Sequence, residues 1–130
     1  MAELSDAASK RLTTERTTWL CTVRPDGSPH VTPVWFVYRD DTWWISTQEG
    51  NRKTRNLIAE PRVSLALPDG DAPLVAEGRA VVHRELHPEI VAAFAEKYDG
   101  WDLTEPGYGS GASVLVEVPV TRWLLAGEAH

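Results

Sequence analysis

Cysteine and long hydrophobic runs are the two features that this sequence most clearly lacks. Its only cysteine, Cys21, has no intrachain partner, so a disulfide framework is excluded and a reducing compartment fits. No apolar stretch approaches the ~18 residues that a membrane-spanning helix needs. The polar, acidic N-terminus does not resemble a signal peptide. At 130 residues the chain has the usual size of one domain. We therefore expect a single cytoplasmic domain over residues 1–130 that has no contact with a membrane.

Positive charge is also scarce. The chain has 13 Lys and Arg residues against 19 Asp and Glu residues, which gives a net charge of -6. Proteins that bind nucleic acids generally present a basic surface, so we expect no nucleic-acid partner.

Metal-ligand clusters and catalytic motifs are missing as well. The four histidines are scattered at positions 30, 83, 87 and 130. His83 and His87 are four residues apart, but a strand-to-helix break between them undoes that spacing. We therefore expect no zinc or iron site. The sequence also lacks a nucleophile elbow and the glycine-rich loops of P-loop and dinucleotide-binding proteins.

What the sequence does contain is a series of short strand patterns separated by turn residues. Pro33 lies inside the second pattern, and because proline cannot donate to a ladder it predicts an edge, a bulge or a break there. Three short helices are also indicated, near residues 5–16, after Asn51, and after His87. Hairpin spacing of this kind predicts a mainly β fold, a six-stranded antiparallel barrel with short helices. The six predicted strands cover residues 17–23, 29–38, 42–47, 62–67, 74–83 and 113–125.

A basic turn follows the third predicted strand. Gly50 gives the turn freedom, Asn51 is a suitable helix N-cap, and Arg52, Lys53 and Arg55 fall in the first helical turn. Cations there oppose the helix dipole, which is unusual in an acidic chain and indicates an anion or phosphate site. The residues alone leave a solvated basic turn as the alternative. A phosphate site without a protein nucleophile would indicate that a bound cofactor carries the chemistry.

Three segments in this order resemble a known family. Residues 19–36 are similar to the opening hairpin of the pyridoxamine 5′-phosphate oxidase-like, split-barrel flavoproteins. Residues 53–65 resemble their next signature, and Glu-Gly-Arg-Ala at 77–80 resembles the strand that follows. The sequences at 32–36 and 53–57 are most similar to the actinobacterial branch that uses the deazaflavin coenzyme F420.

The resemblance implies a six-stranded split β-barrel homodimer with two cofactor sites at the subunit interface. Asn51 stands where some relatives have an arginine, and Arg52 is expected to substitute for it. The resemblance also assigns residues that contact the phosphate, the sugar-alcohol chain and the ring system of the cofactor. They are Thr32, Pro33, Val34, Ser46, Thr47, Asn51, Arg52, Lys53, Arg55 and Asn56.

The resemblance further implies an oxidoreductase in which reduced F420 donates hydride to an unsaturated or quinone-like small molecule. Candidate substrate-pocket residues are His30, Trp35, Tyr38 and, from the glycine-rich loop, Tyr108 or Trp101. For each tryptophan, packing in the core or in a dimer interface is the alternative. No residue is assigned as the catalytic acid. Two alternatives stay open: an FMN-dependent oxidoreductase or FMN-binding protein of the same fold, and a non-catalytic cofactor carrier or sensor.

Overall fold

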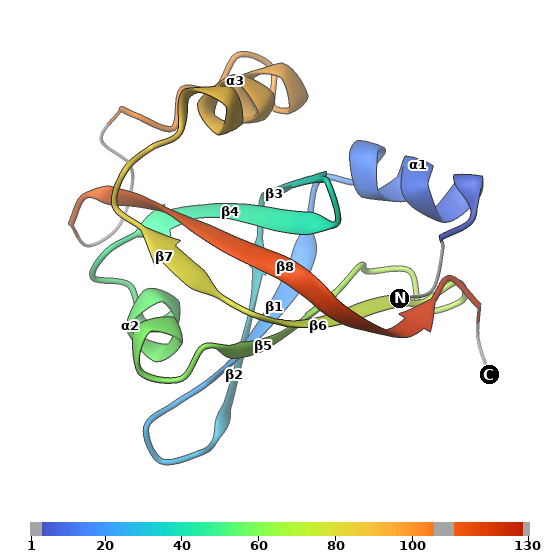
Figure 1. Cartoon of the computed structure of the whole chain (residues 1–130), viewed down its shortest axis with the longest axis horizontal. Helices are drawn as coiled ribbons and strands as arrows, with labels where there is room; N and C mark the ends of the chain where they lie inside the picture. Colours follow the sequence, from blue (N-terminus) through green and yellow to red (C-terminus); the bar gives the residue numbers. More distant parts are fainter. Residues whose placement is uncertain (1–3, 106–110, 129–130) are drawn as a thin grey trace.

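The structure is a computed structural model that describes residues 4–105 and 111–128. In that part of the chain three helices and eight strands follow one another (Figure 1). Their order is α1 (Asp6–Thr14), β1 (Thr18–Val23), β2 (Pro29–Val34), β3 (Phe36–Arg39), β4 (Thr42–Gln48), α2 (Arg52–Ala59), β5 (Arg62–Ala66), β6 (Leu74–Arg79), β7 (Val81–His83), α3 (Pro88–Lys97) and β8 (Ser113–Ala126).

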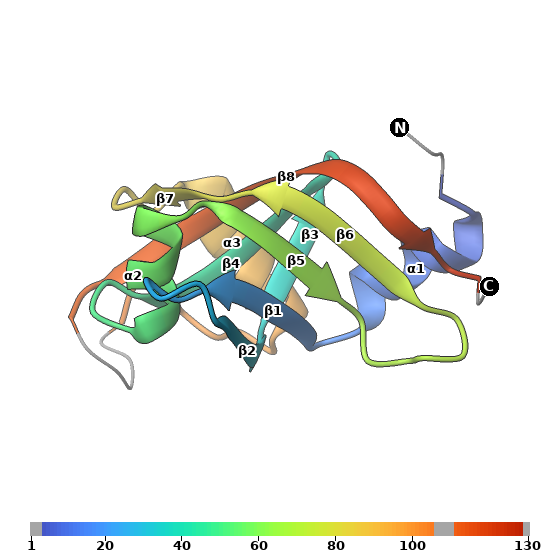
Figure 2. The same cartoon turned by 90° about the horizontal axis from the view of Figure 1, so that it is seen from below.

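All strand pairs are antiparallel, in the order β2-β1-β5-β6-β8-β4-β3, with β7 also pairing with β8. The two ends of this order, β2 and β3, are consecutive in the chain and are separated by Trp35 alone. The sheet therefore curls back toward its own beginning, and Figure 2 shows the strands crossing around a common interior. This curled, mainly β arrangement confirms the predicted split-barrel fold.

Two of the six predicted strands are each interrupted once. The strand predicted over residues 29–38 is divided at Trp35 into β2 and β3. Pro33 lies on β2, a terminal strand of the sheet, which is where a proline is tolerated and agrees with the predicted edge. The strand predicted over 74–83 is divided at Ala80, whose N–H donates to the Pro61 carbonyl at 2.8 Å. Six predicted strands thus become eight.

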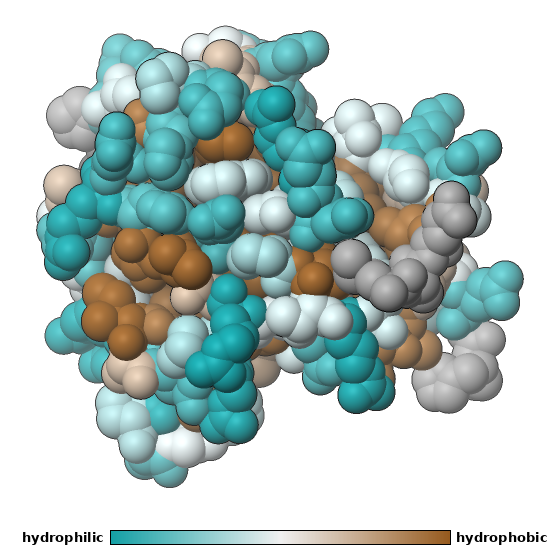
Figure 3. All heavy atoms as spheres, in the orientation of Figure 1, coloured by the Kyte–Doolittle hydropathy of each residue, from teal (hydrophilic) through white to brown (hydrophobic). Residues whose placement is uncertain are grey.

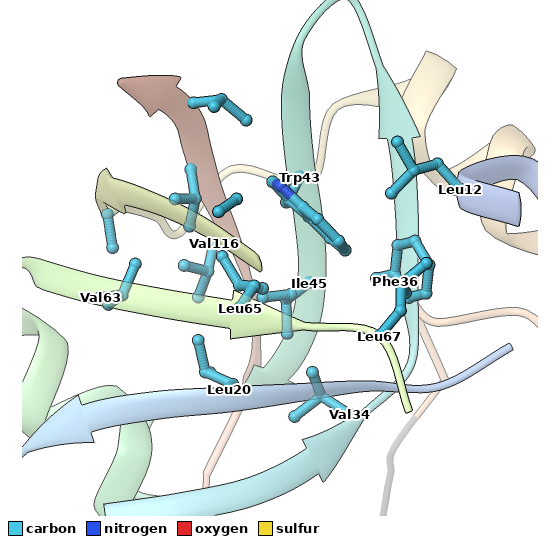
Figure 4. Close-up of a cluster of buried hydrophobic side chains, with 14 of the residues drawn as sticks. Leu12, Leu20, Val34, Phe36, Trp43, Ile45, Val63, Leu65, Leu67 and Val116 are labelled. Atoms are coloured by element: carbon cyan, nitrogen blue, oxygen red, sulfur yellow. The ribbon is translucent and has the colours of Figure 1, made fainter. Parts of the chain in front are cut away.

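The barrel interior is filled by side chains from almost every strand (Figure 4). Val34 and Phe36 point inward from the two sides of the Trp35 break, as the predicted alternation requires. Trp43 is fully buried beside Phe36, and Leu12 reaches the same cluster from α1. Burying such a side chain contributes roughly 1.5–3 kcal/mol, so Leu12, with Ala8 in the same cluster, helps to hold α1 on the barrel.

Gly78 lies at an irregularity in the ladder, where a bulge was predicted. The pairing of β6 with β8 changes register between Glu77 and Gly78. A Cβ atom placed on Gly78 would lie 2.5 Å from the Pro119 carbonyl oxygen. Only glycine therefore allows the two backbones to approach this closely.

The helix boundaries follow their sequence signals. The Ser5 hydroxyl accepts a hydrogen bond from the Ala8 N–H at 3.1 Å and caps α1. Helix α2 ends at Glu60, immediately before Pro61. Helix α3 covers the outer side of the sheet. Its predicted apolar stripe, which repeats every four residues, contributes to a second hydrophobic cluster there. The fully or partly buried members of that stripe are Leu86, Ile90, Phe94 and Tyr98.

None of the helices in the described ranges is long and apolar enough to cross a membrane.

The strand-to-helix break after His83 does not separate it from His87, contrary to the expectation from sequence. Their ring centroids are 4.9 Å apart, and His83 Nε2 lies 2.8 Å from Glu117 Oε1. Within residues 4–105 and 111–128, however, no three His, Cys, Asp or Glu residues form a group that could hold a metal ion.

Candidate functional site

The turn between β4 and α2 is held by side-chain hydrogen bonds. The Asn51 amide donates to Thr47 Oγ1 at 3.1 Å and to Gln48 Oε1 at 3.0 Å. The Thr54 hydroxyl donates to the Gln48 carbonyl at 2.7 Å. Asn51 occupies the predicted N-cap position, but its side chain accepts no bond from a helix N–H. The positive end of α2 is therefore left without a side-chain cap.

Three cations surround this helix start. Arg52 and Arg55 are exposed, Lys53 is half-buried, and the first turn contains no acidic residue. In the described part of the chain, none of these three side chains forms an ion pair or a hydrogen bond. Burial lowers the pKa of the Lys53 ammonium because it removes solvent from the charged form. Since the helix dipole also disfavours cations here, an anionic ligand would relieve the electrostatic cost.

His30 and Thr32 on β2 belong to the same region. The pKa of His30 is lowered, first by burial and then by the nearby charges of Arg24, Lys53 and Arg52. Two polar atoms, His30 Nδ1 and Thr32 Oγ1, are buried without a hydrogen-bond partner among the described residues. Buried polar atoms of this kind normally have a partner in the protein, in water or in a ligand. The structure thus places His30, a predicted substrate residue, beside the basic helix start.

The two residues predicted to lie along the cofactor's sugar-alcohol chain have side chains on opposite faces of β4. Thr47 is buried on the barrel side of β4 and accepts the bond from Asn51, so it is joined to the helix start. Ser46 is its neighbour in the strand, and its side chain points to the opposite face. Only the Thr47 side chain therefore faces the region of Lys53.

Asn56 lies beneath the basic helix start and does not form part of its surface. It is 1% exposed, and its amide donates to Thr22 Oγ1 at 3.0 Å. This bond joins α2 to β1, so Asn56 supports the position of the helix. Its Oδ1 atom is a third buried acceptor without a partner.

The predicted substrate residues do not form one group. Trp35 stacks on Tyr98 with ring centroids 4.3 Å apart and meets Trp101 edge-on at 5.4 Å. Tyr38 lies elsewhere, in contact with Trp43, and its hydroxyl is 3.3 Å from Asp41 Oδ1. Tyr108 lies outside the described residues. The exposed aromatic cluster beside β2 is thus formed by Trp35 and Trp101.

Tyr98 was predicted only as a core residue, yet its hydroxyl joins three segments. It accepts from the Phe36 N–H at 2.9 Å and donates to the Arg16 carbonyl at 2.7 Å, with the Phe36 carbonyl also 2.9 Å away. The backbone on one side of the Trp35 break is therefore held by α3. The four-residue apolar period indicated that Tyr98 is buried, but nothing in the sequence indicated the partner of its hydroxyl.

Comparison with known proteins assigns the chain to a family. A family model described as pyridoxamine 5′-phosphate oxidase matches residues 4–126. The chain belongs to the pyridoxamine 5′-phosphate oxidase family. No curated protein matches it significantly.

Solved structures of the same fold are named after different cofactors. An F420 reductase is 26% identical, with a TM-score of 0.75, over 92% of this chain and 98% of that chain. A FAD-binding protein from Mesorhizobium loti is 24% identical, with a TM-score of 0.70, over 92% of both chains. The heme storage protein HutZ from Vibrio cholerae is 20% identical, with a TM-score of 0.74, over 98% of both chains. The last two likenesses show the shared fold alone. Membership of the pyridoxamine 5′-phosphate oxidase family places the protein among cofactor-binding, oxidoreductase-like proteins.

Proposed function

We propose that the protein is an oxidoreductase that uses reduced coenzyme F420 to transfer hydride to an unsaturated or quinone-like small molecule. One observation carries the proposal: cations at the start of α2 lie beside buried polar atoms of β2, and neither set has a partner among the described residues. Both features are explained by an anionic cofactor bound between the helix start and the strand. The similarity to an F420 reductase over 92% of this chain supports the choice of cofactor.

The residues of the site fit the parts of such a cofactor. The α2 N–H groups, Arg52 and Lys53 would bind the phosphate, with Arg55 at the exposed rim. Thr47 lies at the end of β4, where the sugar-alcohol chain would pass. The backbone of Thr32, Pro33 and Val34 would line the ring system, because the Val34 side chain lies in the barrel core and Pro33 is exposed on the opposite face. When bound, the deazaflavin supplies the carbon from which hydride is transferred, while the protein supplies position and electrostatics.

The choice between F420 and FMN depends on charge beyond the phosphate. Both cofactors have a tricyclic ring, a ribityl chain and a phosphate, and F420 adds an anionic oligoglutamate tail. Arg62 is not available for that tail, because Glu60 Oε1 accepts from its Nε at 3.1 Å and from its Nη2 at 2.7 Å. Arg52 and Arg55 are exposed and have no such partner in the part of the chain that the structure describes. Each exposed pair contributes only ~0.2–1 kcal/mol, so discrimination is modest and salt-dependent.

We further propose a homodimer with the cofactor at the interface. The outer face of β1 and β2 exposes Trp19 (42%) and Val31 (54%), and Trp35 beside it is 43% exposed. Trp19 lies opposite Pro33 in the ladder, so these apolar groups adjoin the strand that would line the ring. Sedimentation at micromolar concentration should give about twice 14.4 kDa. A monomer at that concentration would contradict the proposal that the cofactor binds at a subunit interface.

The cofactor is identified by purifying the protein from a host that makes both F420 and FMN. We expect the absorbance spectrum and the mass of the released cofactor to be those of F420. Dissociation constants for both cofactors should then be compared at low and high salt. Tighter binding of FMN at both salt concentrations would contradict the assignment of F420 and identify FMN as the cofactor. Binding of F420 without turnover of any quinone or unsaturated acceptor would favour a carrier or sensor.

A further inference from the structure

A groove of about 700 Å³ lies between α1 and α3, separate from the basic helix start. Figure 1 shows the two helices on either side of β3, and Figure 3 shows apolar atoms in the recess between them. Val37 from β3 and Ala93 from α3 give the groove an apolar lining, while Leu12 from α1 borders it but is fully buried. None of its lining residues belongs to the proposed cofactor site.

Three of the groove's lining residues are cations, and among the described residues only Arg16 has a charged partner. Arg16 pairs with Asp99 at 3.2 Å, and Arg39 reaches the Glu89 carbonyl at 3.5 Å. Lys97 donates to the Phe36 carbonyl at 2.9 Å and lies 3.6 Å from the centroid of the Phe36 ring. Within the described ranges, no carboxylate lies within the 4.0 Å of an ion pair from its ammonium. A half-buried ammonium with only neutral partners beside an apolar surface is suited to an added carboxylate.

We propose that this groove binds a small amphipathic carboxylate, whose charged end pairs with Lys97 and whose apolar part lies on Val37 and Ala93. The balance of charge supports this ligand. Arg16, Arg39 and Lys97 face the groove against a single lining carboxylate, Glu96, although the whole chain carries a net charge of -6. A phosphate without an apolar part would leave the lining uncovered, and a neutral apolar ligand would leave the ammonium unpaired.

The pH dependence of binding should identify Lys97. Burial lowers the pKa of Lys97 to about 8, the nearby Arg16 charge lowers it further, and Glu15 opposes the shift. The other ionisable groups that face it are Tyr98, Tyr38, Arg39 and Glu96. Because a carboxylate binds the charged form of Lys97, its affinity should fall as the pH rises through about 8. An arginine at this position stays charged, so Lys97→Arg should bind equally well across that range.

Octanoate is a suitable probe, measured by isothermal titration calorimetry at neutral pH. Lys97→Gln should weaken octanoate binding by about tenfold or more. Ala93→Glu, which adds bulk and a carboxylate to the groove at a partly exposed helical position, should abolish it. Lys10→Gln, on the exposed face of α1, is the matched control and should bind like the wild type. Ala93→Glu keeps the test decisive if Lys97→Gln fails to fold.

Several results would overturn the proposal. They are no octanoate binding at millimolar concentration, equal binding by the Ala93→Glu variant, and equal binding of inorganic phosphate. Loss of octanoate binding in Lys53→Ala would assign it to the basic helix start. Retained binding in that variant supports the groove, whatever cofactor the protein uses.

Discussion

Lys53 and Lys97 are both half-buried lysines in short helices, and burial lowers the pKa of each. Lys97 lies in the last turn of α3, where the helix dipole favours a cation, and it contacts the Phe36 carbonyl and ring. Lys53 lies in the first turn of α2, where the dipole disfavours a cation, and the described residues give it no partner. The fold gives the Lys97 ammonium two neutral partners, whereas the Lys53 ammonium lies in an unfavourable dipole position without one. The comparison therefore separates a cation to which the fold supplies neutral partners from one that lies at a helix start with no partner among the described residues.

Replacing Lys53 tests this difference most directly. Lys53→Ala should weaken cofactor binding by about 1.5–3 kcal/mol, or roughly 10–150-fold, because a charge-assisted hydrogen bond to phosphate is lost. Its free energy of unfolding should stay close to that of the wild type. Fluorescence titration with F420 and with FMN measures the affinity. Arg122→Ala removes an exposed cation on β8 and serves as the control. Unchanged affinity for both cofactors would exclude Lys53 from phosphate binding.

The packing around Lys97 can be tested by replacing its neighbour Tyr98. Tyr98→Phe removes the hydroxyl that joins Phe36 to Arg16, which should lower the free energy of unfolding by about 1–3 kcal/mol. Tyr38→Phe loses only a 3.3 Å contact with Asp41 and should change stability little. Urea unfolding of the two variants gives the difference. Equal stabilities would show that the hydroxyl at Tyr98 has no special role.

The smallest expected effect is in the pH dependence of stability. Burial lowers the pKa of Lys97 from 10.5 to about 8, so between these values the unfolded chain binds more protons than the folded protein. Stability relative to Lys97→Met should therefore increase as the pH rises through this window. Because the side chain is partly exposed, the increase should be no more than about 1 kcal/mol. Urea midpoints of both proteins at several pH values measure it, and a constant difference would contradict the shift.

Much of the fold was predictable because its signals are local. The turn at Gly27, the cap at Ser5 and the alternation through Phe36 each depend on neighbouring residues. The breaks at Trp35 and Ala80 were not predicted at these residues. They depend on bonds to distant partners, such as the Ala80 N–H to the Pro61 carbonyl.

The candidate site was predicted unevenly for the same reason. The basic turn was evident from charge order alone, but the burial of Asn56 and the opposite directions of Ser46 and Thr47 depend on how the barrel closes. The groove at Lys97 was missed entirely. A lysine in the last turn of a helix is ordinary in sequence, and only the packing of α1 against β3 gives it an apolar surrounding.

The position of β8 has a consequence for synthesis of the chain on the ribosome. This 14-residue strand pairs with β4 on one side and with β6 and β7 on the other, so the sheet has no continuous path without it. Until residues 113–126 leave the exit tunnel, the nascent chain exposes the unpaired edges of β4 and β6, which are sites for aggregation. We expect stalled chains that end before residue 113 to be digested rapidly by protease and full-length released chains to resist. Equal resistance would show that the first strands fold without β8.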